Sequence, residues 1–225
     1  MWIKICGTTN LEDARLAVDA GADALGFVFA PSPRRINPRD AGRIIRELGN
    51  TAEKVGVFVN QSPEIILDTV EKAGLTAVQL HGDEELAVAR QLLRAAQAGK
   101  RTLKIIKTVS MADRISEPYT GAIDESWDRE AHEVISALLL DSGSRGKRGG
   151  SGEVFDWQTS APIVRFLGKR FKVIIAGGLN AQNVGNAIEL FRPWGVDVAS
   201  GIEREPGKKD AEKVRAFIKA VREAS

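Results

Sequence analysis

Short runs of apolar residues recur along the chain, and longer amphipathic segments separate them. Several runs are nearly continuous in apolar residues (LGFVF, VGVFV, ALLLD and KVIIA), which is typical of strands covered on both faces. The pattern predicts eight strands: Trp2–Cys6, Ala24–Phe29, Lys54–Val59, Ala77–Leu80, Leu103–Lys107, Ser136–Asp141, Lys172–Ala176 and Val196–Ser200.

The amphipathic segments between these strands predict helices. Leu11–Ala20 follows Asn10 as an N-cap and ends at Gly21, and Pro63–Ala73 lies between Ser62 and Gly74 in the same way. Further predicted helices are Glu84–Ala98, Trp157–Leu167, Ala181–Leu190 and Ala211–Ala224. The segment Thr108–Glu133 is too irregular for a regular helix, so we expect a short helix plus a surface loop there, with Asp124–His132 as an insertion.

Eight strands alternating with helices predict an α/β fold, a single-domain (β/α)8 TIM barrel spanning residues 1–225. A doubly wound sheet is the competing architecture. It normally has fewer strands and a GxGxxG loop after the first one, whereas here the first strand ends in Cys6-Gly7-Thr8-Thr9. The barrel is therefore the better interpretation.

Composition narrows the class of protein. The chain of 225 residues is 43% hydrophobic and 28% charged, and 32 basic against 30 acidic side chains leave a net charge of +2. This balance predicts neither nucleic acid nor membrane as a partner. The N-terminus MWIKICGTTN does not resemble a signal peptide, no apolar run approaches about 18 residues, and one cysteine suits a reducing compartment. We expect a soluble, cytoplasmic protein.

Glycine-rich loops follow the seventh and eighth predicted strands. Gly177 and Gly178 follow one, and Ser200 and Gly201 follow the other. Loops after these two strands commonly hold phosphate in a barrel, since glycine lets backbone amides approach an anion. A single Gly-Gly pair more often makes a tight turn, but two such loops in adjacent units favour a phosphate site.

A thiol and a carboxyl group end two other strands. Cys6 ends the first strand and Asp141 the sixth, so a barrel brings both to the rim where its active site forms. Together they can serve as a base and an acid, with a modest electropositive push supplying thiolate at Cys6. A lone strand cysteine is more often a buried small hydrophobe. Asp141, after an apolar strand, is either functional or paired.

Arg35, after the second strand, offers a planar fork for a carboxylate or phosphate. Arg34 beside it could face water, and either arginine could be a solvated loop charge. Gly149-Gly150-Ser151-Gly152 resembles a mobile loop over the site, or equally a plain surface excursion. Basic residues precede it and could attract an anion: Arg145, Lys147 and Arg148.

Other chemistries lack their residues. Only His81 and His132 are present, no His/Asp/Glu cluster has metal-ligand spacing, and the chain has neither GxSxG nor a Walker A loop. We therefore expect no metal. The main alternative to acid–base chemistry is a Schiff base on Lys107, at the end of the fifth strand.

The motifs, taken together, resemble the phosphoribosylanthranilate isomerase family of tryptophan biosynthesis. In order, they are KICG from Lys4, DALGFVF from Asp23, VQLHG from Val78, LDS from Leu140, GGSGEVFDW from Gly149, AGGLN from Ala176, VDVASGIE from Val196 and PGKKD from Pro206. They cover nearly the whole chain. Thr9 and Ala199 depart from the residues more common in the family, but neither removes a proposed acid or base.

The resemblance implies an intramolecular aldose–ketose isomerase without a cofactor. Its reaction is the Amadori rearrangement of N-(5′-phosphoribosyl)anthranilate to 1-(2-carboxyphenylamino)-1-deoxyribulose 5-phosphate. It implies Asp141 as the general acid at the furanose ring oxygen and Cys6 as the general base at C2. The substrate contacts that it implies are Arg35 at the anthranilate carboxylate, Asp197, His81 near the site, and Gly178, Ser200 and Gly201 at the phosphate.

Two other functions stay open at this point. A related indole-glycerol-phosphate-forming synthase would need additional catalytic lysine and glutamate residues at strand ends. A non-catalytic barrel that binds a phosphorylated ligand would be indicated by loss of the acid or base, yet both are present. The expected partner is a small phosphorylated amino sugar, and the expected assembly is a monomer or a homodimer.

Overall fold

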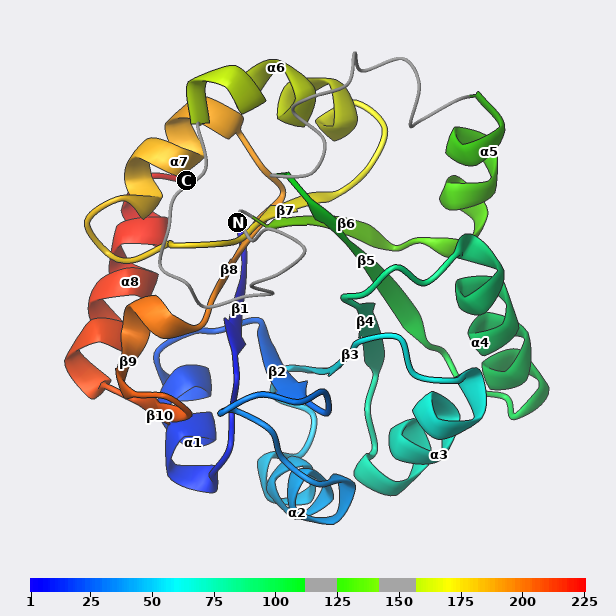
Figure 1. Ribbon diagram of the computed structural model, residues 1–225. Coiled ribbons are helices and arrows are strands. Elements are labelled where there is room, and N and C mark those ends of the chain that lie inside the picture. The colour runs from blue at the N-terminus through cyan, green and yellow to red at the C-terminus, as the bar shows by residue number, and fades with distance from the viewer. Residues whose placement is uncertain (112–124, 142–156) are drawn as a thin grey trace.

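Eight parallel strands form a closed barrel in which each strand pairs with the next and β8 pairs with β1 (Figure 1). The computed structural model describes residues 1–111, 125–141 and 157–225. The strands are β1 Trp2–Cys6, β2 Ala24–Val28, β3 Glu53–Phe58, β4 Ala77–Leu80, β5 Lys104–Ser110, β6 Ala137–Asp141, β7 Val173–Ile175 and β8 Gly195–Val198. The predicted TIM barrel is confirmed.

Helices surround the barrel on its outside (Figure 1). They are α1 Leu11–Asp19, α2 Pro38–Leu48, α3 Pro63–Ala73, α4 Leu86–Ala98, α5 Glu125–Val134, α6 Trp157–Gly168, α7 Val184–Phe191 and α8 Ala211–Glu223. Between β8 and α8 lie a short 3₁₀ helix, η1 Ser200–Ile202, and a hairpin of β9 Glu203–Glu205 and β10 Lys208–Lys209. In the described part of the chain, no helix combines the length and apolar character needed to span a membrane.

Local capping explains where the helices begin and end. The Asn10 side chain accepts a hydrogen bond from the backbone N–H of Asp13, and Gly74 ends α3 in the left-handed conformation, as predicted. Ser62 occupies the N-cap position of α3 without a capping hydrogen bond from its side chain. Helix α2 was absent from the predicted set, although Asn37 caps it and Pro38 stands at its first position.

The irregular segment predicted at Thr108–Glu133 requires correction. Its first residues, Thr108–Ser110, extend β5 and pair with β6 as far as Ser110↔Asp141. The short helix expected in this segment is confirmed, because Glu125–Val134 forms α5, the helix that joins β5 to β6. That Asp124–His132 is an insertion stays a prediction. Residues 112–124 lie outside the described residues. So do 142–156, which include the predicted mobile loop at Gly149–Gly152 and its basic neighbours Arg145, Lys147 and Arg148. In addition, β8 ends at Val198, and Ser200 begins η1 instead of ending the strand.

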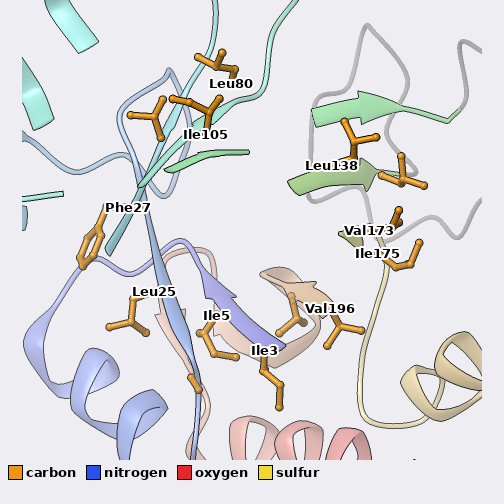
Figure 2. Close-up of a cluster of buried hydrophobic side chains, with 14 of the residues drawn as sticks. Ile3, Ile5, Leu25, Phe27, Leu80, Ile105, Leu138, Val173, Ile175 and Val196 are labelled. Atoms are coloured by element: carbon orange, nitrogen blue, oxygen red, sulfur yellow. The ribbon is translucent and has the colours of Figure 1, made fainter. Parts of the chain in front are cut away.

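Alternate strand residues face opposite sides of the barrel wall. Outward residues such as Ile3, Ile5 and Leu25 belong to the large core cluster shared with the helices (Figure 2). A second cluster fills the interior of the barrel: Ala24, Val55, Ala77, Ile106, Ala137, Leu139, Ile174 and Ala176, with Trp2 against it. The alternation therefore turns Lys4 and Cys6 of β1 inward with Trp2.

Candidate active site

The barrel places Cys6 and Asp141 at the same end of its interior. Cys6 is the last residue of β1, on the inward face. Asp141 is the last residue of β6 and continues the inward series of Ala137 and Leu139. Both residues are buried. Because all eight strands are parallel, both side chains lie at their carboxyl ends, where the fold builds active sites.

A buried ion pair lies next to Cys6. Lys4, two residues earlier on β1, donates from Nζ to Oδ1 of Asp197 on β8 at 2.8 Å, and the lysine side chain is 0% exposed. Gly26 on β2 leaves the space for these groups. A Cβ there would lie 2.8 Å from Sγ of Cys6 and 3.1 Å from Cε of Lys4. The thiol and the lysine therefore fill the volume that a side chain at position 26 would need.

Burial has the largest effect on the pKa of the Cys6 thiol. It raises the pKa of Cys6, the charges of Lys4 and Lys209 oppose that rise, and the charge of Asp197 adds to it. For Lys4, burial alone would lower the pKa, but Asp197 and Cys6 outweigh it and raise the pKa. The electropositive push expected from the sequence is present, but it does not lower the thiol pKa below its ordinary value.

Asp141 lies beside a hydrogen-bonded cluster on β4 and β5. Its Oδ2 is 3.4 Å from Nε2 of His81. Nδ1 of the same imidazole lies 2.8 Å from Nε2 of Gln79 and 3.2 Å from Oγ1 of Thr108. Because the Gln79 amide donates to Nδ1, the proton of a neutral imidazole is on Nε2, facing Asp141. Oε1 of Gln79 is buried and has no hydrogen-bond partner among the described residues.

The two adjacent arginines have different environments. Arg34, expected to face water, instead forms a bidentate pair with Glu203, with Nε–Oε1 at 2.9 Å and Nη2–Oε2 at 2.7 Å, and its side chain is only 13% exposed. Arg35 is exposed in the loop that follows β2, and its guanidinium has no partner among the residues that the structure describes. Only Arg35 is therefore available to a ligand.

The two glycine-rich loops touch through their backbones. Gly177 and Gly178 adopt positive φ angles of 88° and 64°, which favour glycine. A Cβ at Gly201 would lie 1.9 Å from the carbonyl oxygen of Leu179, so no side chain fits there. The backbone amides of Gly177, Gly178, Ser200 and Gly201 have no hydrogen-bond acceptor within the described ranges. Adjacent amides without acceptors are suited to binding an anion.

The rival lysine is engaged elsewhere. Nζ of Lys107 donates to the carbonyl oxygen of Gly82 at 2.8 Å and to Oε2 of Glu84 at 3.1 Å. A Schiff-base lysine must be a neutral nucleophile, and this ion pair stabilises the ammonium form. Among the described residues, no group of three or more His, Cys, Asp or Glu side chains could hold a metal ion.

The sequence reasoning missed several residues around the site. Lys4 and Gln79 could have been found, because each is a long polar residue two positions from a predicted site residue on the same strand face. Glu203 and Lys209 lie within the motifs VDVASGIE and PGKKD, but nothing local indicates their contacts with residues 169 and 203 positions away in the sequence.

Comparison with known proteins agrees with this geometry. The family model "N-(5'phosphoribosyl)anthranilate (PRA) isomerase" matches residues 3–220. An isomerase of that name from Pelobacter propionicus is 42% identical, over 98% of this chain and 95% of its own. The crystal structure of phosphoribosyl anthranilate isomerase from Thermus thermophilus has 38% identity and a TM-score of 0.80, covering 100% of both chains.

A further solved structure contains a bound molecule. It is a phosphoribosyl anthranilate isomerase in complex with reduced 1-(o-carboxyphenylamino)-1-deoxyribulose 5-phosphate, and it covers 99% of both chains with 39% identity and a TM-score of 0.76. These matches cover all or nearly all of the chain. The chain therefore belongs to the N-(5′-phosphoribosyl)anthranilate isomerase family.

Proposed function

We propose that this chain catalyses the Amadori rearrangement of N-(5′-phosphoribosyl)anthranilate to 1-(2-carboxyphenylamino)-1-deoxyribulose 5-phosphate in tryptophan biosynthesis, with Asp141 as general acid and Cys6 as general base. One observation carries the assignment of the roles. In a chain of this family, the only cysteine and a strand-ending aspartate both turn inward at the carboxyl end of the barrel.

The reaction moves protons and needs no electron acceptor. Asp141 donates a proton to the furanose ring oxygen as the bond from that oxygen to C1 breaks. The nitrogen lone pair then forms the C1=N bond of a Schiff base. Cys6 as thiolate takes the proton from C2, which gives an enolamine. Loss of the enol proton and protonation at C1 give the ketone. An acid and a base on opposite sides of one sugar meet these requirements.

The remaining site residues bind and orient the substrate. Arg35 has an exposed guanidinium suited to the anthranilate carboxylate, and the amides of Gly177, Gly178, Ser200 and Gly201 are suited to the phosphate. His81 orients the Asp141 carboxyl group from 3.4 Å and lies next to the sugar. Asp197 is fixed through one oxygen by Lys4, and its other oxygen contacts the sugar. Phosphate and carboxylate contacts remote from C1 and C2 supply orientation.

The test follows the loss of fluorescence of freshly made phosphoribosylanthranilate. Cys6→Ala and Asp141→Asn should each lower kcat by about 10²- to 10⁴-fold, the usual contribution of a general acid or base, with an unchanged circular dichroism spectrum. Arg35→Ala should mainly raise KM. Wild-type turnover in either of the first two variants would reject the assigned roles, and an unchanged KM in the third would reject the carboxylate contact.

Two further expectations concern the setting of the enzyme. Its partner is one small phosphorylated amino sugar, and it acts as a monomer or a homodimer, which light scattering of the purified protein distinguishes. The single cysteine favours the reducing cytoplasm as its compartment.

A further inference from the structure

Lys209, which belongs to neither strand, links the ends of β1 and β8, the first and last strands of the barrel. Strands β1 and β8 pair from Trp2↔Gly195 as far as Ile5↔Val198. Above the last pair, Nζ of Lys209 donates to the carbonyl oxygen of Cys6 at 2.5 Å and to that of Ala199 at 3.5 Å. The lysine thus bridges Cys6 and Ala199, the two residues that directly follow the last β1–β8 pair.

The Lys209 side chain is fully buried and has a complete set of acceptors. Its third acceptor is Oε1 of Glu203, at 2.9 Å, and the side chain is 0% exposed. An ammonium group has three N–H donors, and here three oxygens receive them. Burial lowers the pKa of Lys209, while the Glu203 carboxylate opposes that change. The three acceptors match the ammonium form, whereas a neutral amine would direct a lone pair at an oxygen.

Further contacts hold Lys209 in place. Glu203 is fixed by the bidentate pair with Arg34. The backbone N–H of Lys209 donates to Oδ2 of Asp13 on α1 at 2.9 Å. The hydroxyl of Thr9, in the loop after β1, donates to the carbonyl oxygen of Gly207 in the turn between β9 and β10. The hairpin is therefore attached to α1 and to the loops that follow β1 and β2.

We propose that Lys209 is a positioning residue for the isomerase reaction, because it fixes the end of β1 that carries Cys6 against the loop that carries Ser200 and Gly201. The proposal rests on the proposed function, which assigns the base to Cys6 and phosphate contacts to those two residues. Lys209 touches neither sugar nor phosphate in this scheme. It sets the distance between the base and the anion site through two backbone carbonyls.

This distance matters because the two groups act on one substrate. The phosphate anchors one end of the sugar, and the thiolate must then meet the hydrogen at C2. On the β2 side Cys6 still pairs with Gly26, and the Gly7 N–H donates to the Gly26 carbonyl oxygen at 3.0 Å. On the β8 side pairing ends at Ile5↔Val198, so Lys209 links this end of β1 to the loop that follows β8. An error of about 1 Å at a reacting atom costs about 10²-fold in rate.

The experiment compares Lys209→Met with Lys54→Met. Lys54 is another buried lysine, but it lies near the start of β3, at the opposite end of the barrel. We expect Lys209→Met to lower kcat by about 10²-fold and also to raise KM, since base and phosphate loop both shift. Lys54→Met should keep both constants. Wild-type kcat and KM in a folded Lys209→Met variant would overturn the proposal.

A second measurement separates positioning from a loss of stability. Cys6 is the only cysteine, so alkylation by iodoacetamide reports on that thiol alone. The pH at which alkylation reaches half its maximal rate should rise in Lys209→Met, because a nearby positive charge is lost, and should stay unchanged in Lys54→Met. A larger unfolded fraction would move this midpoint in the opposite direction, towards the ordinary thiol pKa of about 8.5, because unfolding removes the burial that raises the pKa of Cys6. An unmoved midpoint together with unchanged kinetic constants counts against Lys209.

A third variant decides the matter if Lys209→Met does not fold. Glu203→Gln keeps the ammonium but removes the charge that anchors it, and should lower kcat at least about tenfold; wild-type kinetics in that variant would overturn the proposal. The proposed function is tested separately by Cys6→Ala in the otherwise unchanged chain. If Cys6→Ala keeps its turnover, the assigned base is wrong. If only the Lys209 and Glu203 variants keep theirs, the base stands and the positioning role is wrong.

Discussion

The substitution Gly26→Ala places one methyl group against the proposed base. A Cβ at this position lies 2.8 Å from Sγ of Cys6, whereas ordinary van der Waals contact begins at 3.4–4 Å. Sγ must therefore move by about 0.6 to 1.2 Å, the difference between these distances. Gly26 is not among the glycines with positive φ, so the methyl group adds no backbone strain of its own. The tightest contact is with the thiol, and the methyl group also lies 3.1 Å from Cα of Cys6 and from Cε of Lys4, so the change acts mainly on Cys6 and the lysine beside it.

The magnitude follows from the size of this displacement. A shift of about 1 Å at a reacting group lowers the rate by about 10²-fold, which corresponds to about 2.7 kcal/mol in the activation barrier. Overpacking of this kind costs about 1–3 kcal/mol of the free energy of unfolding, against a total of about 5–15 kcal/mol for a domain. The variant should therefore fold and turn over slowly.

The assay again follows the loss of phosphoribosylanthranilate fluorescence, with urea unfolding measured on the same samples. We expect kcat to fall about 10²-fold with little change in KM, because the glycine loops and Arg35 are untouched. The matched control is Gly168→Ala at the end of α6, where an added Cβ meets nothing within 4 Å. A folded Gly26→Ala variant with wild-type kcat would refute the reasoning, since the thiol would then tolerate displacement.

Three other predictions concern pH and phosphate binding. Burial raises the pKa of Cys6, so kcat/KM should still be rising with pH above the ordinary thiol range of about 8.5, and a plateau reached below neutral pH would contradict this. For Glu203, burial alone would raise the pKa, but Arg34 and Lys209 outweigh it and hold the pKa below its ordinary value. The stability that this carboxylate contributes is therefore present above its unfolded pKa, about 4.3, and is lost as pH falls towards the folded pKa. The difference in unfolding free energy between wild type and Glu203→Gln should shrink in that pH window. A difference that does not depend on pH would count against the ion pair. Gly201→Ala should raise KM and weaken competitive inhibition by inorganic phosphate, because its Cβ would collide with the Leu179 carbonyl oxygen and separate the two loops; unchanged values for both would remove the phosphate site from this position.

The sequence was sufficient to predict the barrel and the location of each of its eight strands, although β5 extends beyond its predicted end and β8 ends before its predicted end. Continuous apolar runs and their spacing identified all eight strands, because parallel strands covered on both faces have few polar positions. The placement of Cys6 and Asp141 followed directly, since a residue that ends a parallel strand lies at one known end of the barrel. The short helix expected in Thr108–Glu133 could not be given bounds, because Glu125–Val134 is polar and adjoins an irregular stretch, so periodicity does not show where the helix begins.

Apolar runs and periodicity could not predict the contacts between residues that are distant in the sequence. Nothing local distinguishes Arg34 from Arg35, yet one is committed to Glu203, 169 positions later, and the other is not. The same holds for the thiol. Whether nearby cations or burial dominate its pKa depends on Lys4, Asp197 and Lys209, which come together only when the barrel closes. Strand periodicity reports which way a residue faces, and it says nothing about the partner that it meets there.

Closure between β1 and β8 also has a consequence for how the protein is made. Cys6, the proposed general base, is synthesised with the first strand. Its neighbours come much later, because Asp197 is 193 positions from its partner Lys4, and Lys209 is 203 positions from Cys6. In a nascent chain, Lys4 and Cys6 therefore lack these partners until β8 and the hairpin that follows it have been translated. Contacts between residues this distant in sequence slow folding, so the active site should form late and in one step during synthesis.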